Sequence, residues 1–403
     1  MRWSVTWIVL LSSASLLAQT RSLHLEIGDP ARKGQEARLV LDAITDTASG
    51  QLITPRDLAV ELADTGLVIL GESHTSMEFH KVQLRVIEEL DRAGRKVLIG
   101  LEMYPYPQQI HLDHWCDGLL TERGFVELSH WYDNWGYNWN YYREIFIFAR
   151  DHGIRLHALN APRDVVSAVR KKGFQNLTPE EAAHIPAHID TTSEEHFALF
   201  KSMLEEGEGM HSSMSDAQWH AMFDAQCTWD ATMAYNAVRT LKEEPDPKAV
   251  MVVLIGSGHA AYGLGIQRQA RQWYKGKAAA VIPIMVQVED NKPIETVRAS
   301  YADFIWGILP EKDPLYPDLG VATVEAKGSN RRAVVSVSDD SVGKAAGFSV
   351  GDVLVSLDGN PVPDRETLNT LMASKRWGDE AEFVVERGGK QATLHALFRR
   401  RAP

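Results

Sequence analysis

Short apolar runs alternate with helical patterns over most of residues 60–290 of this chain. Each run has the length of a buried strand and is bounded by polar or small residues, and the runs are 66–71, 96–101, 154–159, 250–256 and 278–288. Apolar side chains at helical spacing fill stretches between them, such as 77–91. Strands that alternate with helices of this length are typical of βαβ units. The sequence therefore predicts an α/β fold with a central, largely parallel sheet flanked by helices.

A long stretch at residues 178–244 breaks the alternation, because it is helical in character and rich in His, Met and Glu. It begins at Thr178 with a capping residue, a Pro at the first helical position and acids in the first turn. We expect a helical insertion that packs on the α/β core. The histidines of this stretch are irregularly spaced, so solvated helix faces explain them better than a metal site: His184, His188, His196, His211 and His220.

Length and composition limit the possible classes of protein. A chain of 403 residues favours two or three domains, and a hydrophobic fraction of 44% allows a sizeable core. The formal net charge of −12 argues against general binding of nucleic acid, which needs a basic face. After about residue 310 the pattern changes to short strands separated by Gly, Asp and Asn turns, with a boundary at 314–317. We expect a second, smaller β-rich domain there.

The first residues carry a targeting pattern. Residues 1–18 combine a short, mildly positive start with a mostly apolar stretch that ends at Ala18, which predicts a cleaved signal peptide. The alternative is a buried N-terminal helix. Gln19 stands where a lipoprotein would carry its lipid-bearing cysteine, and no other uncharged apolar stretch has spanning length. We therefore expect an exported protein, periplasmic or extracellular, without a transmembrane or lipid anchor in its mature form.

Two cysteines are present, Cys116 and Cys227. In an oxidising compartment they could form one disulfide, but the sequence does not show that they are close. Because the chain has no Cys-x-x-Cys-His motif, c-type haem attachment by that motif is excluded.

Charged and imidazole side chains follow the predicted strands, at the point where each strand ends. Glu72 and His74 follow the first run, Glu102 follows the second, and His259 follows the run at 250–256. Ligands bind at the carboxyl ends of strands in open α/β sheets, so these side chains are expected to converge. Such ligands suit a divalent ion such as Mn, Co or Zn, and a spare glutamate can serve as base. Alternatively, the glutamates cap helices and the histidines pack in the core.

Residues 60–290 resemble the ChaN family of haem-binding proteins, in the superfamily that includes Tiki-type proteases and erythromycin esterases. The motifs that carry the resemblance are Leu-Gly-Glu-Ser-His at 70–74, Gly-Leu-Glu-Met at 100–103, Leu-His-Ala-Leu-Asn at 156–160 and Gly-Ser-Gly-His at 256–259. The resemblance implies an α/β fold with an apical pocket, haem binding and a role in iron uptake. It also implies that Glu72, His74, Glu102 and His259 correspond to the catalytic or metal site of the hydrolytic members.

An aromatic cluster follows in the same domain. It consists of Trp131, Tyr132, Trp135, Tyr137, Trp139, Tyr141 and Tyr142. Such rings could line a flat porphyrin pocket, with Tyr, His or Met as axial ligand, or they could be ordinary core and lid packing. We take Trp135 and Tyr137 as candidate haem-binding residues, together with Tyr104, which closely follows Glu102.

Residues 318–398 resemble a PDZ domain of the bacterial protease-associated kind. The run 341–354 and the strand and turn at 355–360 carry the resemblance, and residues 364–372 correspond to the helix that flanks the groove. In this binding mode a peptide adds a strand to an open sheet edge. The alternative is a domain used only for internal packing or dimer contacts. The resemblance implies a carboxylate-binding loop formed by Asp318, Leu319, Gly320 and Val321.

The sequence thus leaves three hypotheses open. The first is an exported protein that binds haem or a related iron ligand and recognises peptides through its PDZ domain. The second is a metal-dependent hydrolase that uses Glu72, His74, Glu102 and His259. The third is a non-catalytic adaptor in which only the PDZ domain binds.

Overall fold

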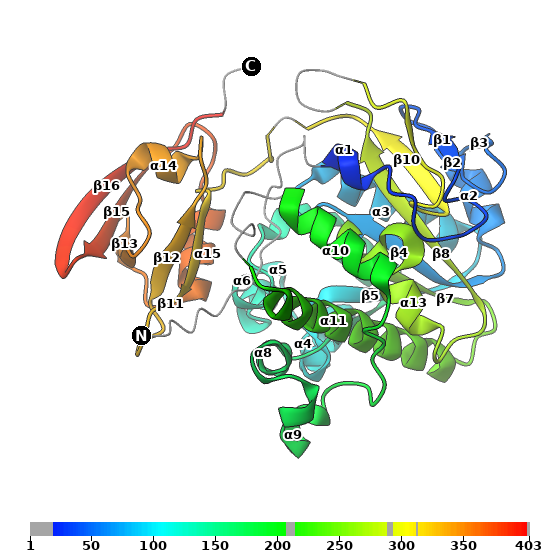
Figure 1. Ribbon diagram of the computed structural model, residues 1–403, viewed down its shortest axis with the longest axis horizontal. Coiled ribbons are helices and arrows are strands. Elements are labelled where there is room, and N and C mark those ends of the chain that lie inside the picture. Colours follow the sequence, from blue (N-terminus) through cyan, green and yellow to red (C-terminus); the bar gives the residue numbers. More distant parts are fainter. Residues whose placement is uncertain (1–18, 207–213, 288–292, 312, 401–403) are drawn as a thin grey trace. The chain divides into compact units, whose positions relative to one another are not determined.

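Figure 1 presents the computed structural model of the chain, which describes residues 19–206, 214–287, 293–311 and 313–400. The described residues form two compact units. The α/β unit contains residues up to 125 and residues 142–311, and the C-terminal unit contains residues 126–141 and those from 313 onwards. The segment 126–141 therefore groups with the C-terminal unit, although it lies inside the range that we expected to form the first domain.

An eight-stranded sheet forms the centre of the α/β unit. In spatial order its strands are β3 (Leu52–Ile53), β2 (Ile44–Asp46), β10 (Phe304–Ile308), β8 (Lys277–Met285), β4 (Thr65–Glu72), β7 (Ala249–Gly256), β5 (Lys96–Pro105) and β6 (Arg155–Asn160). The strands from β10 to β6 run parallel to their neighbours, whereas β2 and β3 pair antiparallel at one edge. The predicted, largely parallel sheet is confirmed.

Helices cover both faces of this sheet, which explains the continuous apolar runs in the sequence. Leu67, Val68 and Ile69 of β4 are all 0% exposed. Figure 1 shows α10 and α11 in front of the sheet and α3 behind it. The helices of the unit are α1 (Gln19–Ser22), α2 (Pro55–Glu61), α3 (Met77–Arg92), α4 (Gln109–Cys116), α7 (Arg143–Asp151), α8 (Arg163–Lys172), α9 (Pro179–Ala182), α10 (Glu194–Glu206), α11 (Asp216–Glu243), α12 (Ser257–Ala260) and α13 (Ile266–Ala270).

The helical insertion lies between β6 and β7, and its first helix begins as the sequence indicates. Thr178 caps α9 by accepting a hydrogen bond from the Glu181 backbone N–H at 3.2 Å, and Glu181 bonds back to the Thr178 N–H at 2.7 Å. Ser215 caps α11 in the same reciprocal way with Gln218. Helix α11 spans 28 residues and contacts β6, β7 and α8. It therefore brings residues far from the strand-end motifs onto the sheet.

Short elements complete the α/β unit. Strand β1 (Glu36–Arg38) pairs antiparallel with β9 (Thr296–Arg298) in a separate two-stranded sheet. Single-turn 3-10 helices lie at Tyr106–Gln108, Phe174–Asn176 and Ala261–Gly263. Helix α5 (Glu122–Leu128) spans the boundary at residue 125 between the two units.

The C-terminal unit is built on a six-stranded antiparallel sheet. Its strands follow the order β11 (Val321–Glu325), β12 (Arg332–Val337), β13 (Val353–Leu357), β15 (Glu380–Arg387) and β16 (Lys390–Leu397), with β14 (Asn360–Pro361) paired to β13. Two helices accompany the sheet, α14 (Val342–Ala346) and α15 (Arg365–Ala373). Phe383 and Phe398, both 0% exposed, fill its core. The unit also contains α6 (Trp131–Asn134) and a 3-10 helix at Trp139–Tyr141.

Two expectations from the sequence concern the termini and the cysteines. The predicted signal peptide, residues 1–18, lies outside the described residues. None of the helices in the described part of the chain is long and apolar enough to cross a membrane. Cys116 and Cys227 are both free thiols in the structure, so they are not paired with each other.

Candidate functional site

The four strand-end residues come together because their strands are neighbours. Strand β7 lies between β4 and β5, and the register pairs Glu72 with Gly256 and Leu101 with Leu254. The carboxyl ends of the three strands therefore lie at one level, with Glu72 ending β4 and Glu102 near the end of β5. His259 follows in α12, immediately after β7. The predicted convergence at this edge is present in the structure.

Glu72 holds His74 in a fixed orientation. The Glu72 side chain is 0% exposed, and its Oε1 lies 2.8 Å from His74 Nδ1. The Tyr142 hydroxyl donates to the same oxygen at 2.5 Å, and Gln83 Nε2 donates to Oε2 at 2.7 Å. Because both carboxylate oxygens are engaged, Glu72 acts as a buried anchor for the imidazole ring.

The charge states of this pair support each other. Burial alone would raise the pKa of Glu72, but the charge of His80 and the hydrogen bonds of His74 and Tyr142 lower it to about 2. Burial opposes the charged form of His74, yet the hydrogen bond and charge of Glu72 raise the pKa of that imidazole. Glu72 is therefore a carboxylate at neutral pH.

A second carboxylate holds the second imidazole. Asp230 of α11 is 0% exposed, and its Oδ1 lies 2.6 Å from His259 Nδ1. Gln226, one turn earlier on the same helix, places its Nε2 at 2.8 Å from the same ring nitrogen. On the other side of the ring, His259 Nε2 lies 3.4 Å from Glu102 Oε1. His259 thus bridges a carboxylate from the helical insertion and a carboxylate from the sheet.

Burial by itself would lower the pKa of His259, but the charges of Asp230 and Glu102 raise it to about 10. Burial would likewise raise the pKa of Glu102, but the charge and hydrogen bond of His259, with the charge of His74, lower it. The four residues and Asp230 therefore form one buried cluster in which carboxylates and imidazoles alternate.

The close approach of His74 and Glu102 depends on Gly256. The Gly256 backbone N–H donates to Glu102 Oε2 at 2.7 Å. A Cβ atom at position 256 would lie 3.0 Å from His74 Cε1, 3.3 Å from His74 Nε2 and 3.7 Å from Glu102 Oε2. The pairing of β5 with β6 shifts register between Leu101 and Pro105, next to Glu102. Such irregularities change the direction in which nearby side chains point. Both features bring the side chains of β4 and β5 together over the end of β7.

This arrangement presents two imidazoles, each tied at Nδ1 to a buried carboxylate, with Glu102 beside both. A carboxylate on Nδ1 fixes the tautomer and orientation of a ring whose Nε2 then acts as a base, an acid or a metal ligand. No group of three or more His, Cys, Asp or Glu side chains among the described residues is placed to hold a metal ion. The structure therefore gives no support to the predicted divalent-metal site. The two carboxylate-bound imidazoles are instead suited to proton transfer or axial ligation.

Sequence reasoning missed the residues that support the site from helices. His80 and Gln83 of α3 contact Glu72, and Gln226 and Asp230 of α11 contact His259. His196 of α10, assigned to a solvated helix face, is 1% exposed, and its Nε2 lies 3.7 Å from Asp230 Oδ2. For His196 that expectation is wrong, because α10 packs on α11 and buries the ring. A polar residue in the middle of a helix gives no local signal of such a role.

The three candidate haem-binding residues belong to two different units. Tyr104 is 0% exposed, and its ring centroid lies 6.2 Å from that of Phe125, so it is a core residue of the α/β unit. Trp135 and Tyr137 belong to the C-terminal unit, where their rings make an edge contact at 5.4 Å. Tyr104 therefore packs in the core of the α/β unit, whereas Trp135 and Tyr137 pack against each other within the C-terminal unit.

Most side chains of the aromatic cluster are buried rather than exposed to solvent. Trp131, Trp139, Tyr141 and Tyr142 are between 0% and 5% exposed. Trp131 and Trp139 meet edge to face at 4.9 Å, and the Trp131 Nε1–H donates to the Tyr137 backbone oxygen at 2.8 Å. The packing alternative therefore describes these rings, with Tyr142 as the exception that reaches the site through its hydroxyl.

The predicted carboxylate-binding loop precedes edge strand β11. The Gly320 N–H donates to Asp318 Oδ1 at 2.8 Å, and the Leu319 backbone oxygen accepts from the Gly343 N–H at 2.7 Å. Gly320 has a φ of +66°, and a Cβ atom there would lie 2.3 Å from Ser341 Cβ, so only glycine fits. Leu319 is 8% exposed and joins the core, while Val321 begins β11. The loop therefore leads directly into β11, the end strand of the sheet.

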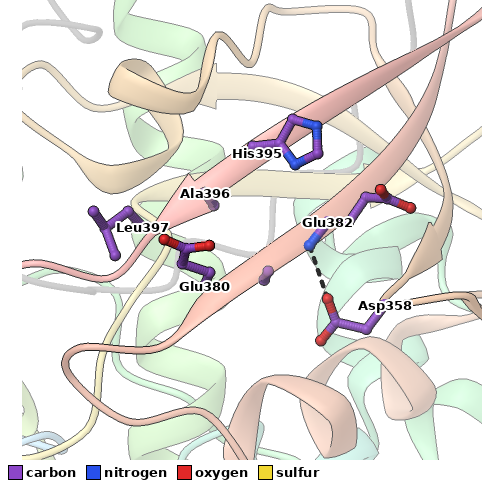
Figure 2. Close-up of a pocket in the computed structure, with 7 residues that line it drawn as sticks. Asp358, Glu380, Glu382, His395, Ala396 and Leu397 are labelled. Atoms are coloured by element: carbon purple, nitrogen blue, oxygen red, sulfur yellow. Dashed lines mark hydrogen bonds between the residues drawn. The ribbon is translucent and has the colours of Figure 1, made fainter.

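A pocket of the C-terminal unit lies at the other side of its sheet. Figure 2 shows that Asp358, Glu380, Glu382 and His395 line it, and that the Glu382 N–H donates to Asp358 Oδ1, at 2.8 Å. Its walls come largely from β15 and β16, whereas the predicted peptide edge is β11. This pocket is therefore distinct from the peptide groove.

Comparison with solved structures supports the fold of the α/β unit. The structure described as cofacial heme binding to ChaN of Campylobacter jejuni is 16% identical, covers 65% of this chain and 95% of that one, and has a TM-score of 0.50. At this identity the likeness shows a shared fold. The HtrA-type protease AlgW with decapeptide is 23% identical over 22% of this chain and 30% of that one, with a TM-score of 0.20.

A curated relative, the chloroplastic Protein RETICULATA-RELATED 5 of Arabidopsis thaliana, is 21% identical over 256 residues, or 61% of this chain. The chain spans about a third of the length of that relative, 34%. Family models match both parts of the chain. The PDZ domain model matches residues 317–397. The model described as haem-binding uptake, Tiki superfamily, ChaN matches residues 58–269, more than half of the chain, which therefore belongs to the ChaN family and carries a PDZ domain.

Proposed function

We propose that this protein binds haem or a related iron ligand at the strand-end site of its α/β unit. The observation that carries the proposal is the pair of carboxylate-bound imidazoles, Glu72–His74 and Asp230–His259, in a member of a haem-binding family. Haem proteins commonly use a histidine whose Nδ1 is bonded to a carboxylate or carbonyl, because this raises the basicity of Nε2. Bound haem would supply an iron centre with open coordination positions.

His74 fits the role of axial ligand best. Its side chain is 14% exposed, whereas that of His259 is 8% exposed and its Nε2 already lies 3.4 Å from Glu102. Glu72 would orient the His74 ring, and Gly256 would keep the space beside its Nε2 open. Tyr104, a candidate because it closely follows Glu102, is 0% exposed, so we prefer His74.

A haemin titration of the full chain tests this proposal. We expect a saturable shift of the Soret band at micromolar haemin, and His74→Ala should weaken binding by at least about tenfold. Gly256→Ala should also weaken it, because the new Cβ crowds the His74 ring. His188→Ala, which changes an exposed histidine, and Gly34→Ala, which has open space around it, serve as controls. The absence of a saturable shift in the unchanged protein would rule the proposal out.

The same geometry favours a second candidate, hydrolysis by general acid–base catalysis. Glu102 and two oriented imidazoles could activate a water molecule and protonate a leaving group, which contributes about 10²–10⁴-fold to a rate. Ester and peptide hydrolysis is measured in parallel on the same variants. Activity that is lost in both His74→Ala and His259→Ala, without haemin binding, would favour this candidate. If neither property is found but C-terminal peptides bind, the protein is an adaptor.

We also propose that the protein is exported and that its PDZ domain recognises peptide C-termini. Export is supported by the composition of residues 1–18, and peptide recognition by the loop at 318–321 beside edge strand β11. If export is correct, N-terminal sequencing of the mature protein from a periplasmic or secreted fraction begins at Gln19. An N-terminus at Met1 in that fraction would contradict cleavage.

A further inference from the structure

A segment from the middle of the chain lies along helix α15 of the PDZ domain. The aromatic segment, defined here as residues 129–141, belongs to the same compact unit as the PDZ sheet. Arg365 at the start of α15 donates to the Asp133 backbone oxygen at 2.7 Å. Asn369, one turn later, donates from Nδ2 to the Tyr132 backbone oxygen at 2.8 Å. The contacts thus follow one face of the helix.

The contact continues to both ends of α15. Asn138 Nδ2 donates to the Ala373 backbone oxygen at 2.9 Å, and Asn138 is 7% exposed. Tyr141 packs edge to face on Tyr316 at 5.2 Å, close to the start of the carboxylate-binding loop. The segment therefore runs along the helix that flanks the peptide groove, from its first residue to its last.

Close approach of the segment to α15 depends on Gly136. This residue has a φ of +89°, and a Cβ atom there would lie 2.9 Å from Asn369 Nδ2 and 3.0 Å from Arg365 Nη2. A side chain at position 136 would therefore strain the backbone and displace the ends of the two polar side chains that hold the segment.

A side chain of the neighbouring strand β12 contacts the edge strand β11 of the groove. Arg332 of β12 is 6% exposed, and its guanidinium donates to the Thr323 backbone oxygen of β11 at 2.7 Å. Burial lowers the pKa of Arg332, the charge of Arg365 lowers it further, and the charges of Glu325 and Asp133 oppose this. A backbone carbonyl of the strand that a peptide would extend is already bonded to a side chain.

The carboxylate-binding loop has an internal partner as well. The Gly320 N–H, one of the donors expected to face a peptide carboxylate, donates to Asp318 Oδ1 at 2.8 Å. A side-chain carboxylate therefore occupies a donor that the terminal carboxylate of a peptide would need. The flanking helix, the edge strand and the loop all carry internal contacts in this structure.

We propose that the aromatic segment is an internal competitor that holds the PDZ groove closed, so that a peptide C-terminus binds only when the segment leaves α15. The inference rests on the proposed recognition of peptides. A groove that is open for only a fraction of the time lowers the apparent affinity for a peptide by that fraction. Loosening the segment should therefore tighten peptide binding without any change in the groove itself.

The test measures peptide affinity in the full chain. The probe is a panel of fluorescein-labelled decapeptides that differ in the last residue and carry a free carboxylate, with the amidated peptides as negative control. In Gly136→Val the new side chain collides with Asn369 and Arg365, and we expect binding at least about tenfold tighter than in the unchanged protein. Gly118→Val is the matched control, because Gly118 has a φ of +69° but a Cβ atom there would meet no other atom within 4 Å.

A milder variant keeps the test valid if Gly136→Val does not fold. Asn138→Ala removes the hydrogen bond to Ala373 from the segment side and leaves α15 unchanged, so it should tighten binding to a smaller degree. In the unchanged protein, saturating peptide should speed hydrogen exchange of the segment amides. Peptides that bind all variants with equal affinity would overturn the internal competitor alone. Peptides that bind none of them would overturn the proposed peptide recognition, and the competitor with it.

Discussion

Replacing Glu72 by alanine is expected to lower the free energy of unfolding by about 3–5 kcal/mol. The Glu72 carboxylate is 0% exposed and holds His74, Gln83 and Tyr142 at distances between 2.5 and 2.8 Å. Its removal leaves a buried imidazole without its counter-charge and buried donors without an acceptor, which is the costly way to break a buried pair. Urea unfolding of the purified variant, followed by tryptophan fluorescence, measures the loss.

Glu72→Gln separates the charge from the shape of this side chain. The amide keeps the volume and one oxygen, so we expect a smaller loss of about 1–3 kcal/mol. Glu78→Ala is the control, because Glu78 lies on α3 and pairs with the exposed Lys81. That change should cost no more than about 1 kcal/mol. Equal stability of Glu72→Ala and Glu78→Ala would show that the buried pairing does not stabilise the fold.

Stability is also expected to fall as the pH is lowered from 6.5 towards 4, because His196 is buried in its neutral form. Burial lowers the pKa of His196 from 6.5 to about 4, with the charges of Asp230 and Arg268 acting in opposite directions. The ring is 1% exposed, and Arg268 Nη2 lies 3.2 Å from its Nδ1, as expected for a nitrogen that accepts. The folded protein therefore resists protonation of this ring.

The direction of this pH dependence follows from the number of protons bound by the folded and the unfolded chain. Between pH 6.5 and 4 the unfolded chain binds a proton at this ring and the folded chain does not, so acid favours unfolding. The contribution is fully present above pH 6.5, and a shift from 6.5 to about 4 corresponds to a loss of about 3 kcal/mol. Glu72, with a pKa lowered to about 2, adds its own loss only below its unfolded value of 4.5.

The measurement compares urea midpoints at pH 6.5, 5 and 4 in the unchanged protein and in His196→Asn. The variant should be less stable at pH 6.5, because it loses packing, but its stability should depend less steeply on pH. His188→Asn, at an exposed position, controls for removal of a histidine. His157, whose pKa burial also lowers to about 4, remains in all three proteins and contributes equally. Identical pH dependence in His196→Asn and the unchanged protein would refute the assignment.

The sequence predicted the features that depend on local pattern. The apolar runs correspond to the central strands β4, β5, β6, β7 and β8, because a strand buried on both faces needs continuous apolar residues. Glu72, His74, Glu102 and His259 were identifiable because they follow such runs, and parallel strands deliver their ends to one edge of the sheet. The PDZ domain was identifiable because the runs 341–354 and 355–360 resemble that family.

Features that depend on tertiary packing were not predictable from the sequence. Asp230 lies in the middle of a 28-residue helix, and only the docking of α11 on the sheet brings it 2.6 Å from His259. Tyr104 stands two residues after Glu102, but its ring turns into the core against Phe125. The aromatic segment was expected to serve the first domain because it lies within it in sequence, whereas its contacts group it with the PDZ sheet.

The grouping of residues 126–141 with the C-terminal sheet has a consequence for dissecting the protein. The two units are not consecutive in sequence, because the chain enters the C-terminal unit at residue 126, returns to the α/β unit at residue 142 and leaves it again after residue 311. No single cleavage point therefore separates them. A truncation at residue 311 would leave Trp131 and Trp139, now 0% and 5% exposed, without the helix that their segment packs on. For the same reason, the PDZ domain of this chain is not a self-contained domain that could be exchanged on its own.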